Sequence, residues 1–540
     1  MVRSHLSSYA VLLAICTVNV LLRFPRGEHE MGIDSFVFHN LINSLVGNQT
    51  ARWVLTPLSY FGLYPLSEPG GSIFLIATNR LIAGLTVEWS ILEVDLVVAI
   101  FGTLGAFLLG REFFRNDRDS LVLSLFMSTT PEFVTFLNWQ VPTRIVFTAL
   151  LPFLLFFVVR FSRNVSTRSG LMMCSTLVLM MSFHRLAILT ALVLLASLGT
   201  AILLVLLRTL RTKFPDLFLS PIVRRNASWV AAGGIIASAG FMFVSTGVLG
   251  SYSEGEVARG NTLGVQLLNL TISLSRSGGL LLPLTAVGVV AITRRRAKSF
   301  SEPFMVLALL SFIPTLFLRQ YTGFYTIPLT SLFAVVGLAA VLGRARSHRG
   351  KSAVLAAALA VALTSSYGII SYDLALEGQL STSVHDLGIY SQTLPPGTWV
   401  FNDGLTGARF GAVSGEAYLP IGGATTPFQG PELLAFGFLR AGSLDIRLAP
   451  PSQLTFESDS PFVLSGVQAE ADWGTILSSM AGSIPAALIN QYSPKYVVAD
   501  ATFPTQFYAY AHYYDSALLV SVQSSRYQIY SDAWVVVWQL

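Results

Sequence analysis

Residues 26–34 read Arg26-Gly-Glu-His-Glu-Met-Gly-Ile-Asp34, and they follow directly after the first apolar run of the chain, Tyr9–Phe24. Three carboxylates, Glu28, Glu30 and Asp34, therefore lie within seven residues of a chain in which only 12% of residues are charged. Carboxylates beside a lipid bilayer are costly to desolvate and do not help a chain to insert. We expect them to hold a divalent cation, a basic partner or a proton.

The composition is that of a membrane protein. The 540 residues are 53% hydrophobic, with a mean hydropathy of +0.62, and apolar runs of about 18 or more residues mark bilayer spans. The first run lacks a clear cleavage site and is interpreted as a retained helix. The segment 71–86 is shorter and carries Asn79 and Arg80, so we expect it to be interfacial or re-entrant. The sequence predicts eleven spans, at about residues 7–24, 91–110, 120–137, 144–160, 169–184, 186–207, 228–248, 277–293, 304–318, 324–343 and 352–372.

Basic residues alternate between the loops that these spans define. The loops on one side hold 20 of the 34 Lys and Arg residues, and the positive-inside rule makes that side cytoplasmic. The N-terminus is then cytoplasmic, while the loop 25–90 and everything after about residue 372 lie outside the cell membrane. This distribution also explains the net charge of +5 without a nucleic-acid partner.

The last part of the chain, residues 373–540, has a different character, because its hydropathy falls and Gly, Pro, Ser and Asp become more frequent. Helix-like stretches such as 474–489 precede short β-rich runs, a pattern typical of an α/β domain. The β-rich runs are Thr398–Phe401, Tyr496–Ala499, Tyr527–Tyr530 and Trp534–Trp538. The predicted fold is a polytopic α-helical membrane domain of about eleven helices (1–372) with a C-terminal extracytoplasmic α/β domain (373–540).

The acidic stretch leads into a second helix. Apolar residues recur near helical spacing through residues 35–46, which predicts an amphipathic helix along the membrane interface that Gly47-Asn48 ends. Asp34 would lie at its N-terminal end, where a carboxylate can cap backbone N–H groups. Capping accounts for one acid, however, and leaves Glu28 and Glu30 unexplained.

Further ionisable side chains fall on the predicted outer side. His39 is a candidate ligand, although a lone histidine is more often a surface or hydrogen-bonding residue, and Glu68 is a fourth external acid. Glu132 lies near the outer end of the third predicted span, and ionisable groups in membranes are functional candidates by default. The structural alternative is that Glu132 pairs with Arg144 or Arg185.

Arg319-Gln-Tyr-Thr-Gly-Phe-Tyr325 joins the ninth and tenth predicted spans on the outside. An arginine with two tyrosines, Tyr321 and Tyr325, suits a phosphate at the level of the lipid headgroups, because a guanidinium matches a phosphate with two hydrogen bonds. The alternative is that Arg319 simply extends to the membrane surface.

Three segments resemble archaeal members of the GT-C glycosyltransferases, a polytopic class that uses lipid-phosphate-linked sugars. They are Gly32-Ile-Asp-Ser-Phe36, Pro57-Leu-Ser-Tyr-Phe-Gly-Leu-Tyr-Pro65 and Asn138-Trp-Gln-Val-Pro-Thr-Arg144, and the resemblance in layout covers about residues 1–345. It implies transfer of a sugar from a polyprenyl- or dolichyl-phosphate donor to an acceptor hydroxyl on a glycan, lipid or protein. The Trp-Trp-Asp-Tyr-Gly motif of the oligosaccharyltransferases in this class is absent from the sequence, which disfavours glycosylation of protein asparagines.

The resemblance also implies roles for single residues. Asp34 and Glu132 would be the catalytic acids and, with Glu30, possible ligands of a divalent metal, Mg²⁺ or Mn²⁺. The resemblance places Arg319 at the lipid phosphate, and the residue types themselves predict a set of four that binds the donor phosphate and a set of three loop residues that faces the acceptor. The first set is Arg319, Tyr321, Tyr325 and Arg144; the second is Glu28, His39 and Glu68.

Two other classes of function remain open from the sequence. A transporter or flippase could use Asp95, Glu132 and Arg185 as a polar pathway, although no internal repeat of the kind common in transporters is found. A non-enzymatic assembly or receptor protein could use the C-terminal domain as a binding module, but it leaves the clustered acids unexplained.

Overall fold

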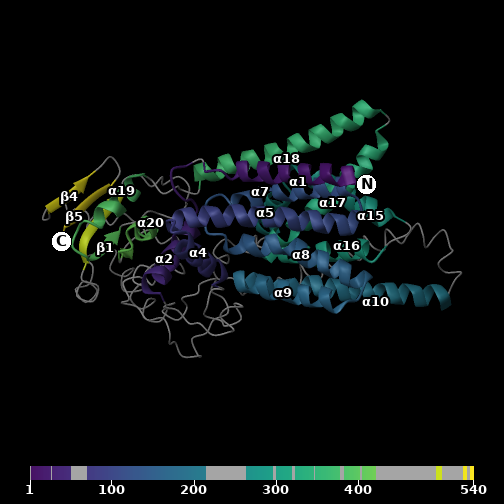
Figure 1. The fold of residues 1–540 in the computed structure, drawn as a ribbon, viewed down its shortest axis with the longest axis horizontal. Coiled ribbons are helices and arrows are strands. Elements are labelled where there is room, and N and C mark those ends of the chain that lie inside the picture. Colours follow the sequence, from purple (N-terminus) through teal and green to yellow (C-terminus); the bar gives the residue numbers. More distant parts are fainter. Residues whose placement is uncertain are drawn as a thin grey trace.

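The computed structural model describes residues 2–25, 27–49, 70–213, 263–295, 299–318, 323–345, 347–376, 382–401, 404–416, 418–420, 494–500, 527–531 and 535–539. A long bundle of helices forms one part of the molecule, and a smaller unit of strands and helices lies at one end of it (Figure 1). The predicted span 228–248, the predicted helix 474–489 and the residues Glu68, Arg319 and Tyr321 lie outside the described residues.

The bundle runs from α1 to α18. Helices α2 (Ile33–Asn48) and α4 (Gly71–Ala83) lie at the end nearest to the C-terminal unit, here called the α2 end (Figure 1). The other elements are α1 (Val2–Leu22), α5 (Val87–Phe114), α6 (Asp117–Ser128), α7 (Pro131–Thr135), α8 (Thr143–Arg163), α9 (Thr167–Phe183), the 3-10 helix η1 (Arg185–Thr190), α10 (Ala191–Lys213), α14 (Leu263–Gly278), the 3-10 helix η3 (Gly279–Leu281), α15 (Leu282–Arg294), α16 (Ser301–Leu318), α17 (Gly323–Arg344) and α18 (His348–Leu376).

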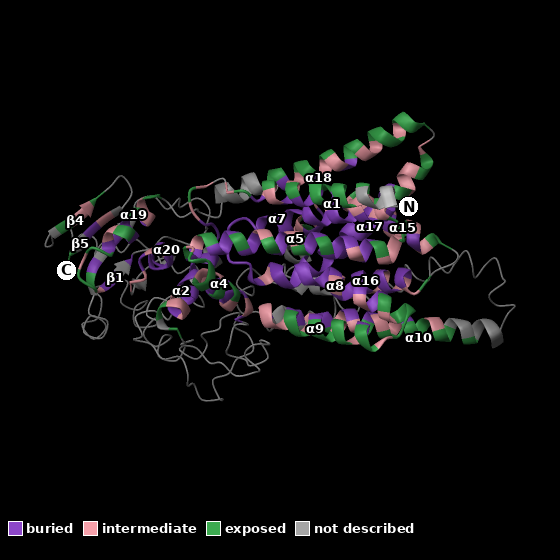
Figure 2. Cartoon of the chain, viewed as in Figure 1, coloured by how far each residue is buried: buried purple, intermediate pink, exposed green. Residues whose placement is uncertain are grey.

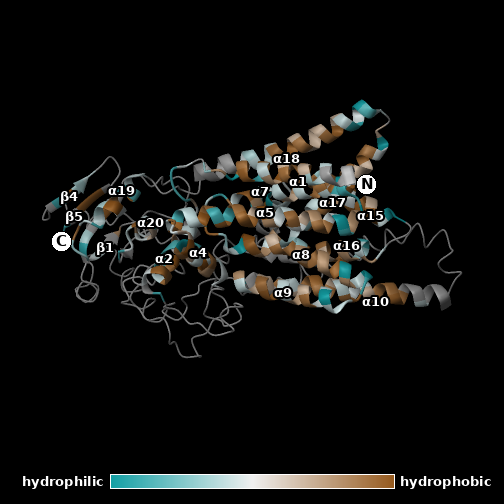
Figure 3. Ribbon diagram, viewed as in Figure 1, coloured by the Kyte–Doolittle hydropathy of each residue, from teal (hydrophilic) through white to brown (hydrophobic). Residues whose placement is uncertain are grey.

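Five of the described helices are long and apolar enough to cross a membrane: α5, α8, the α14–α15 segment from Leu270 to Arg294, α17 and α18 from His348 to Gly368. The outward faces of the bundle carry large apolar side chains, such as Leu13 at 69% and Val205 at 63% exposure (Figure 3). Exposed apolar belts of this extent fit lipid contact, and the chain is an integral membrane protein. The predicted total of eleven spans is not tested by the described residues.

The third predicted span, 120–137, is wrong as a single helix. Helix α6 ends at Ser128, Thr130 is extended (φ −65°, ψ 141°), and the short helix α7 begins at Pro131. A proline clashes with a helical conformation of the residue before it but fits the first position of a new helix. The break places Glu132 in α7, beyond the end of α6.

Helix α17 forms the centre of the bundle. Its residues from Gly323 to Leu338 are all buried, and α15, α16, α8 and α6 pack around it (Figure 2). Helices α15 and α17 approach most closely at Gly288 and Gly337. A Cβ added at Gly337 would lie 1.9 Å from the carbonyl oxygen of Leu284, so only glycine permits this backbone contact.

Gly337→Ala should destabilise the bundle by about 1–3 kcal/mol, because the added methyl group forces α15 and α17 apart. Thermal unfolding of the purified protein in detergent measures the effect. Gly343→Ala is the matched control on the same helix, since a Cβ there meets no atom within 4 Å. Equal melting temperatures for the two variants would contradict the proposed close contact.

The described part of the C-terminal region contains five strands and two helices. They are α19 (Thr382–Ser391), β1 (Thr398–Phe401), α20 (Gly404–Ser414), β2 (Tyr418–Pro420), β3 (Pro494–Asp500), β4 (Tyr527–Ser531) and β5 (Val535–Gln539). The sheet order is β2-β1-β3-β5-β4, with β1 parallel to β2 and β3, and β5 antiparallel to β3 and β4. Four strands thus form where the β-rich runs predicted them, while the limits of a domain 373–540 stay a prediction.

Candidate active site

The first turn of α2 is joined to the loop between α7 and α8. The Met31 N–H donates to the Trp139 carbonyl (2.9 Å), and the Val141 N–H donates to Ser35 Oγ (2.8 Å). Asp34 lies between these two points of attachment and is the second residue of α2, although the structure does not describe its side chain. The structure therefore brings the backbone of Asp34 beside the segment that connects Glu132 to Arg144.

Gly32 makes this approach possible. It is the residue that precedes α2, its φ is +89°, and a Cβ added there would lie 2.5 Å from Gln140 Oε1. A larger residue would be strained by this φ and would also push the loop away. The helix predicted after Asp34 is confirmed, and Asp34 lies in its first turn, where a negative charge is favourable.

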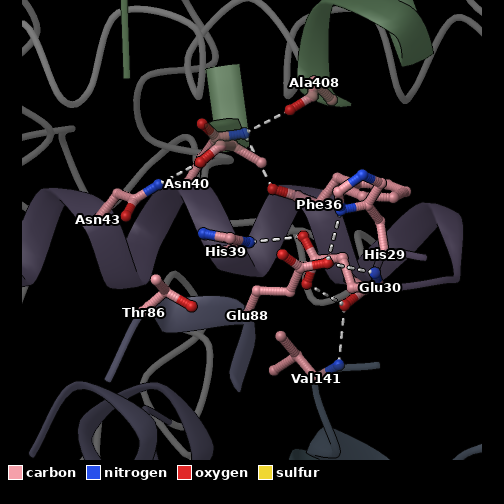
Figure 4. Close-up of polar contacts among 12 residues, drawn as sticks. His29, Glu30, Phe36, His39, Asn40, Asn43, Thr86, Glu88, Val141 and Ala408 are labelled. Carbon is pink, nitrogen blue, oxygen red and sulfur yellow. Dashed lines mark hydrogen bonds and ion pairs between the residues drawn. The ribbon is translucent and has the colours of Figure 1, made fainter. Parts of the chain in front are cut away.

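Glu30 and Glu88 share a cluster with two histidines, in which Glu30 and His39 are buried and Glu88 and His29 half-buried (Figure 4). Glu30 Oε1 lies 2.5 Å from His39 Nδ1, and the Glu30 N–H donates to Glu88 Oε1 at 2.7 Å. His29 Nδ1 lies 3.3 Å from the same Glu88 oxygen. Glu30 is only 1% exposed, so its carboxylate depends on the imidazole of His39 in α2 as a buried hydrogen-bond partner.

Removing only one partner of this buried pair should cost about 1–3 kcal/mol, because the other is left buried without its hydrogen-bond partner. Glu30→Ala and His39→Ala are therefore each expected to destabilise the protein strongly. The free energy of unfolding lost in the double variant should be smaller, by about 0.5–3 kcal/mol, than the sum of the two single losses. Thermal unfolding of the four proteins measures this coupling, and strictly additive effects would contradict the pair.

Two buried charges hold the segment that contains Glu132. Arg23, just after α1, donates to the carbonyls of Ser128 (3.1 Å) and Phe133 (3.0 Å), and it is 0% exposed. Asp95 of α5, also 0% exposed, accepts from the Gln140 N–H at 3.0 Å. Asp95 is a candidate from the sequence alone, whereas the only sign of Arg23 in the sequence is a charge at the end of the first apolar run.

Glu132 lies in α7, a helix of 5 residues that is too short to span a membrane, and is 3% exposed. Its Oε2 has no hydrogen-bond partner and points toward Gly323, the first residue of α17. Burial raises the pKa of the Glu132 carboxyl to about 8, while the positive charges of Arg276 and Arg144 act in the opposite direction. Glu132 is therefore a buried acid within the electrostatic influence of two arginines, and its pairing with Arg144 or Arg185 stays a prediction.

The other predicted site residues are placed in different surroundings. Tyr325 is 0% exposed in α17, and its ring stacks on Phe312 with centroids 4.6 Å apart, so it is part of the core. Glu28 accepts a hydrogen bond from Thr382 of α19 at 2.9 Å. A phosphate contact for Tyr325 and an acceptor contact for Glu28 remain predictions.

The described residues contain no group of three or more His, Cys, Asp or Glu side chains arranged to hold a metal ion. Glu30, one of the predicted ligands, is bound to His39, and the side chain of Asp34 is not described. The described residues alone thus do not form a complete site for Mg²⁺ or Mn²⁺, which prefer several oxygen ligands.

No protein-family model and no curated protein matches this sequence. Among solved structures, the oligosaccharyltransferase of Archaeoglobus fulgidus, tethered to an acceptor peptide containing the NVT sequon, is similar over 91% of this chain and 69% of its own, with a TM-score of 0.53 and 14% identity. ArnT from Cupriavidus metallidurans, bound to undecaprenyl phosphate, matches over 99% of this chain and 98% of its own, with a TM-score of 0.48 and 12% identity. At such identities the first likeness establishes the fold alone.

Proposed function

We propose that this chain, which has the fold of the GT-C membrane glycosyltransferases, transfers a sugar from a polyprenyl- or dolichyl-phosphate donor to an acceptor hydroxyl. The observation that carries the proposal is the junction at the α2 end of the bundle. There the turn containing Asp34 is hydrogen-bonded to residues 139–141, between the buried acid Glu132 and Arg144. An arginine near an acidic residue suits a reaction in which a phosphate leaves, because its positive charge stabilises the leaving group.

In the proposed reaction, the donor's lipid tail lies between helices and its phosphate lies near Arg144, Arg276 and Arg319. The Asp34 carboxylate takes the proton from the acceptor hydroxyl, whose oxygen forms a bond to the sugar C1. The bond between C1 and the phosphate oxygen breaks, the lipid phosphate keeps the electron pair, and the anomeric centre inverts. The arginines stabilise the leaving phosphate, and Glu132, in its ionised form, is the second catalytic carboxylate of the site.

The alternating basic loops support the orientation. They favour a cytoplasmic N-terminus, which puts the α2 end and the C-terminal unit on the outer side of the cell membrane. An outer active site also fits the donor class, because a lipid carrier presents its sugar at the membrane surface. The acceptor, a glycan, lipid or protein hydroxyl, would approach between the bundle and the C-terminal unit.

The divalent metal that the resemblance implies remains part of the proposal, and no step above depends on it. A bound Mg²⁺ or Mn²⁺ would supply further positive charge for the leaving phosphate. Dialysis against EDTA is expected to lower the activity, and returning either ion should restore it. Activity that EDTA leaves unchanged would contradict a metal requirement.

Mass spectrometry of lipids from cells lacking this protein tests the function. The unused donor should accumulate as a polyprenyl- or dolichyl-phosphate sugar, and purified protein in nanodiscs should convert it to free lipid phosphate and a glycosylated acceptor. If proteoliposomes instead move the lipid-linked substrate across the bilayer without forming a product, the transporter interpretation is correct.

A further inference from the structure

Helix α2 contacts two parts of the molecule on different faces. Ser35 and His39 face α5 and the loop before α8, where Ser35 accepts from Val141 and His39 binds Glu30 (Figure 4). Phe36, Asn40 and Asn43 recur at helical spacing on another face, which contacts α20 of the C-terminal unit. Phe36, Leu41 and Ile42 of α2 are thus covered by protein.

Phe36 belongs to the core of the C-terminal unit although it precedes that unit by more than 340 residues. It is 1% exposed and packs in one cluster with Trp399 of β1 and Phe410 of α20. The guanidinium of Arg409 lies 5.6 Å from the centre of its ring. A core that takes in a phenyl ring from the first loop cannot move away from that loop without opening an apolar cavity.

Two asparagines fix the direction and register of this contact. Asn40 Nδ2 donates to the Ala408 carbonyl (2.9 Å), and Asn43 Nδ2 donates to the Ala412 carbonyl (2.7 Å). Ala412 lies in the last turn of α20, where carbonyls lack partners within the helix. Asn40 is 4% exposed, so an apolar replacement leaves a buried carbonyl with one bond fewer.

The loop before α2 makes a second attachment to the same unit. Thr382 Oγ1 donates to Glu28 Oε2 at 2.9 Å, and the rings of His29 and His385 stack with centroids 4.0 Å apart. The contact therefore continues on the N-terminal side of Asp34 as well as along α2. Residues 28–43 lie between the C-terminal unit and the end of the bundle.

We infer that the C-terminal unit holds α2, and with it Asp34, in the position that transfer requires, so that Phe36, Asn40 and Asn43 are positioning residues. The inference rests on the proposed function, because it takes Asp34 as the catalytic base. Both sets of attachments of α2, to the bundle and to α20, lie within nine residues of Asp34. Loosening one of them changes where the carboxylate lies relative to Glu132.

The test compares full-length wild type with the double variant Asn40→Leu, Asn43→Leu, which keeps the side-chain size but removes both donors. Its kcat should fall roughly 10- to 100-fold, since a displacement of about 1 Å can cost that much. The KM for the donor and the affinity for polyprenyl phosphate should stay at wild-type values. Asn79→Leu is the matched control and should keep the wild-type kcat, because Asn79 donates its hydrogen bond to Glu93, an exposed residue of α5.

Two further measurements keep the inference testable if the double variant folds poorly. Asn43 is only partly buried, so the single variant Asn43→Leu should fold and show a smaller fall in kcat. Asn43→Gln, which retains an amide donor, should recover part of the rate. Amide hydrogen exchange over residues 31–36 should be faster in the leucine variants than in the wild type.

The outcomes separate the inference from the proposed function. A wild-type kcat with a raised KM for the acceptor alone would overturn the inference, because the C-terminal unit would then only recruit acceptor. Unchanged exchange over residues 31–36 would overturn it too. If the wild type transfers no sugar to any acceptor, the proposed function fails, and the exchange experiment alone decides whether the C-terminal unit holds α2.

Discussion

Asp34→Asn protein is expected to transfer sugar about 10²–10⁴-fold more slowly than the wild type, the usual contribution of a general base. Asparagine has nearly the same shape as aspartate but cannot accept the proton of the attacking hydroxyl. Hydrogen bonds of Met31 and Ser35 hold the first turn of α2 to the loop before α8, so the variant should insert and fold normally. Single-turnover kinetics with saturating donor measure the effect on the chemical step.

The matched control for Asp34→Asn is Asp119→Asn. Asp119 also lies in the first turn of a helix, α6, but at the opposite end of the bundle, where its carboxylate accepts from Asn116. This variant should transfer at the wild-type rate. Polyprenyl phosphate should bind equally to both variants, because neither change removes an arginine. An Asp34→Asn protein as fast as the wild type would show that another group takes the proton.

The local elements follow from the sequence because their causes are local. Apolar runs predicted α5, α8 and α17 within a few residues, and the strand Thr398–Phe401 forms over the predicted residues. The break between α6 and α7 was missed because hydropathy averages over a window, whereas a proline acts on one residue. The chain shares its fold with a solved oligosaccharyltransferase, in agreement with the membrane fold that the short motifs implied.

The candidate site was predictable only in part, because its contacts join distant segments. Acids on the predicted outer side, such as Glu30 and Glu132, could be recognised from their cost in a membrane. Their partners could not: Arg23 binds the carbonyl of Phe133 110 positions away, and Asn40 binds Ala408 368 positions away. Such pairs leave no periodic signal in one sequence, so only the fold reveals them.

Glu132→Gln is expected to lower the transfer rate by about 10²-fold or more, as the loss of a catalytic acid typically does. Glutamine fills the same volume beside Gly323 but carries no charge to balance Arg276 and Arg144. Glu302→Gln is the matched control: Glu302 is also largely buried, at 8% exposure, and pairs with Arg295 at the other end of the bundle. It should leave the rate unchanged.

The pH dependence of Glu132 distinguishes its catalytic role from a purely structural one. Burial raises its pKa from about 4.5 to about 8, so the folded protein holds this proton more tightly than the unfolded chain does. Its contribution to stability is then complete below pH 4.5 and is lost as pH rises through about 8. Glu132→Gln should therefore be more thermostable than the wild type at pH 8.5, with a smaller advantage at pH 6.

The transfer rate of the wild type should rise as the pH increases through about 8, since the proposed role needs the ionised carboxylate, and the variant should lack that rise. A variant that gains stability at high pH but keeps the wild-type rate profile would limit Glu132 to packing.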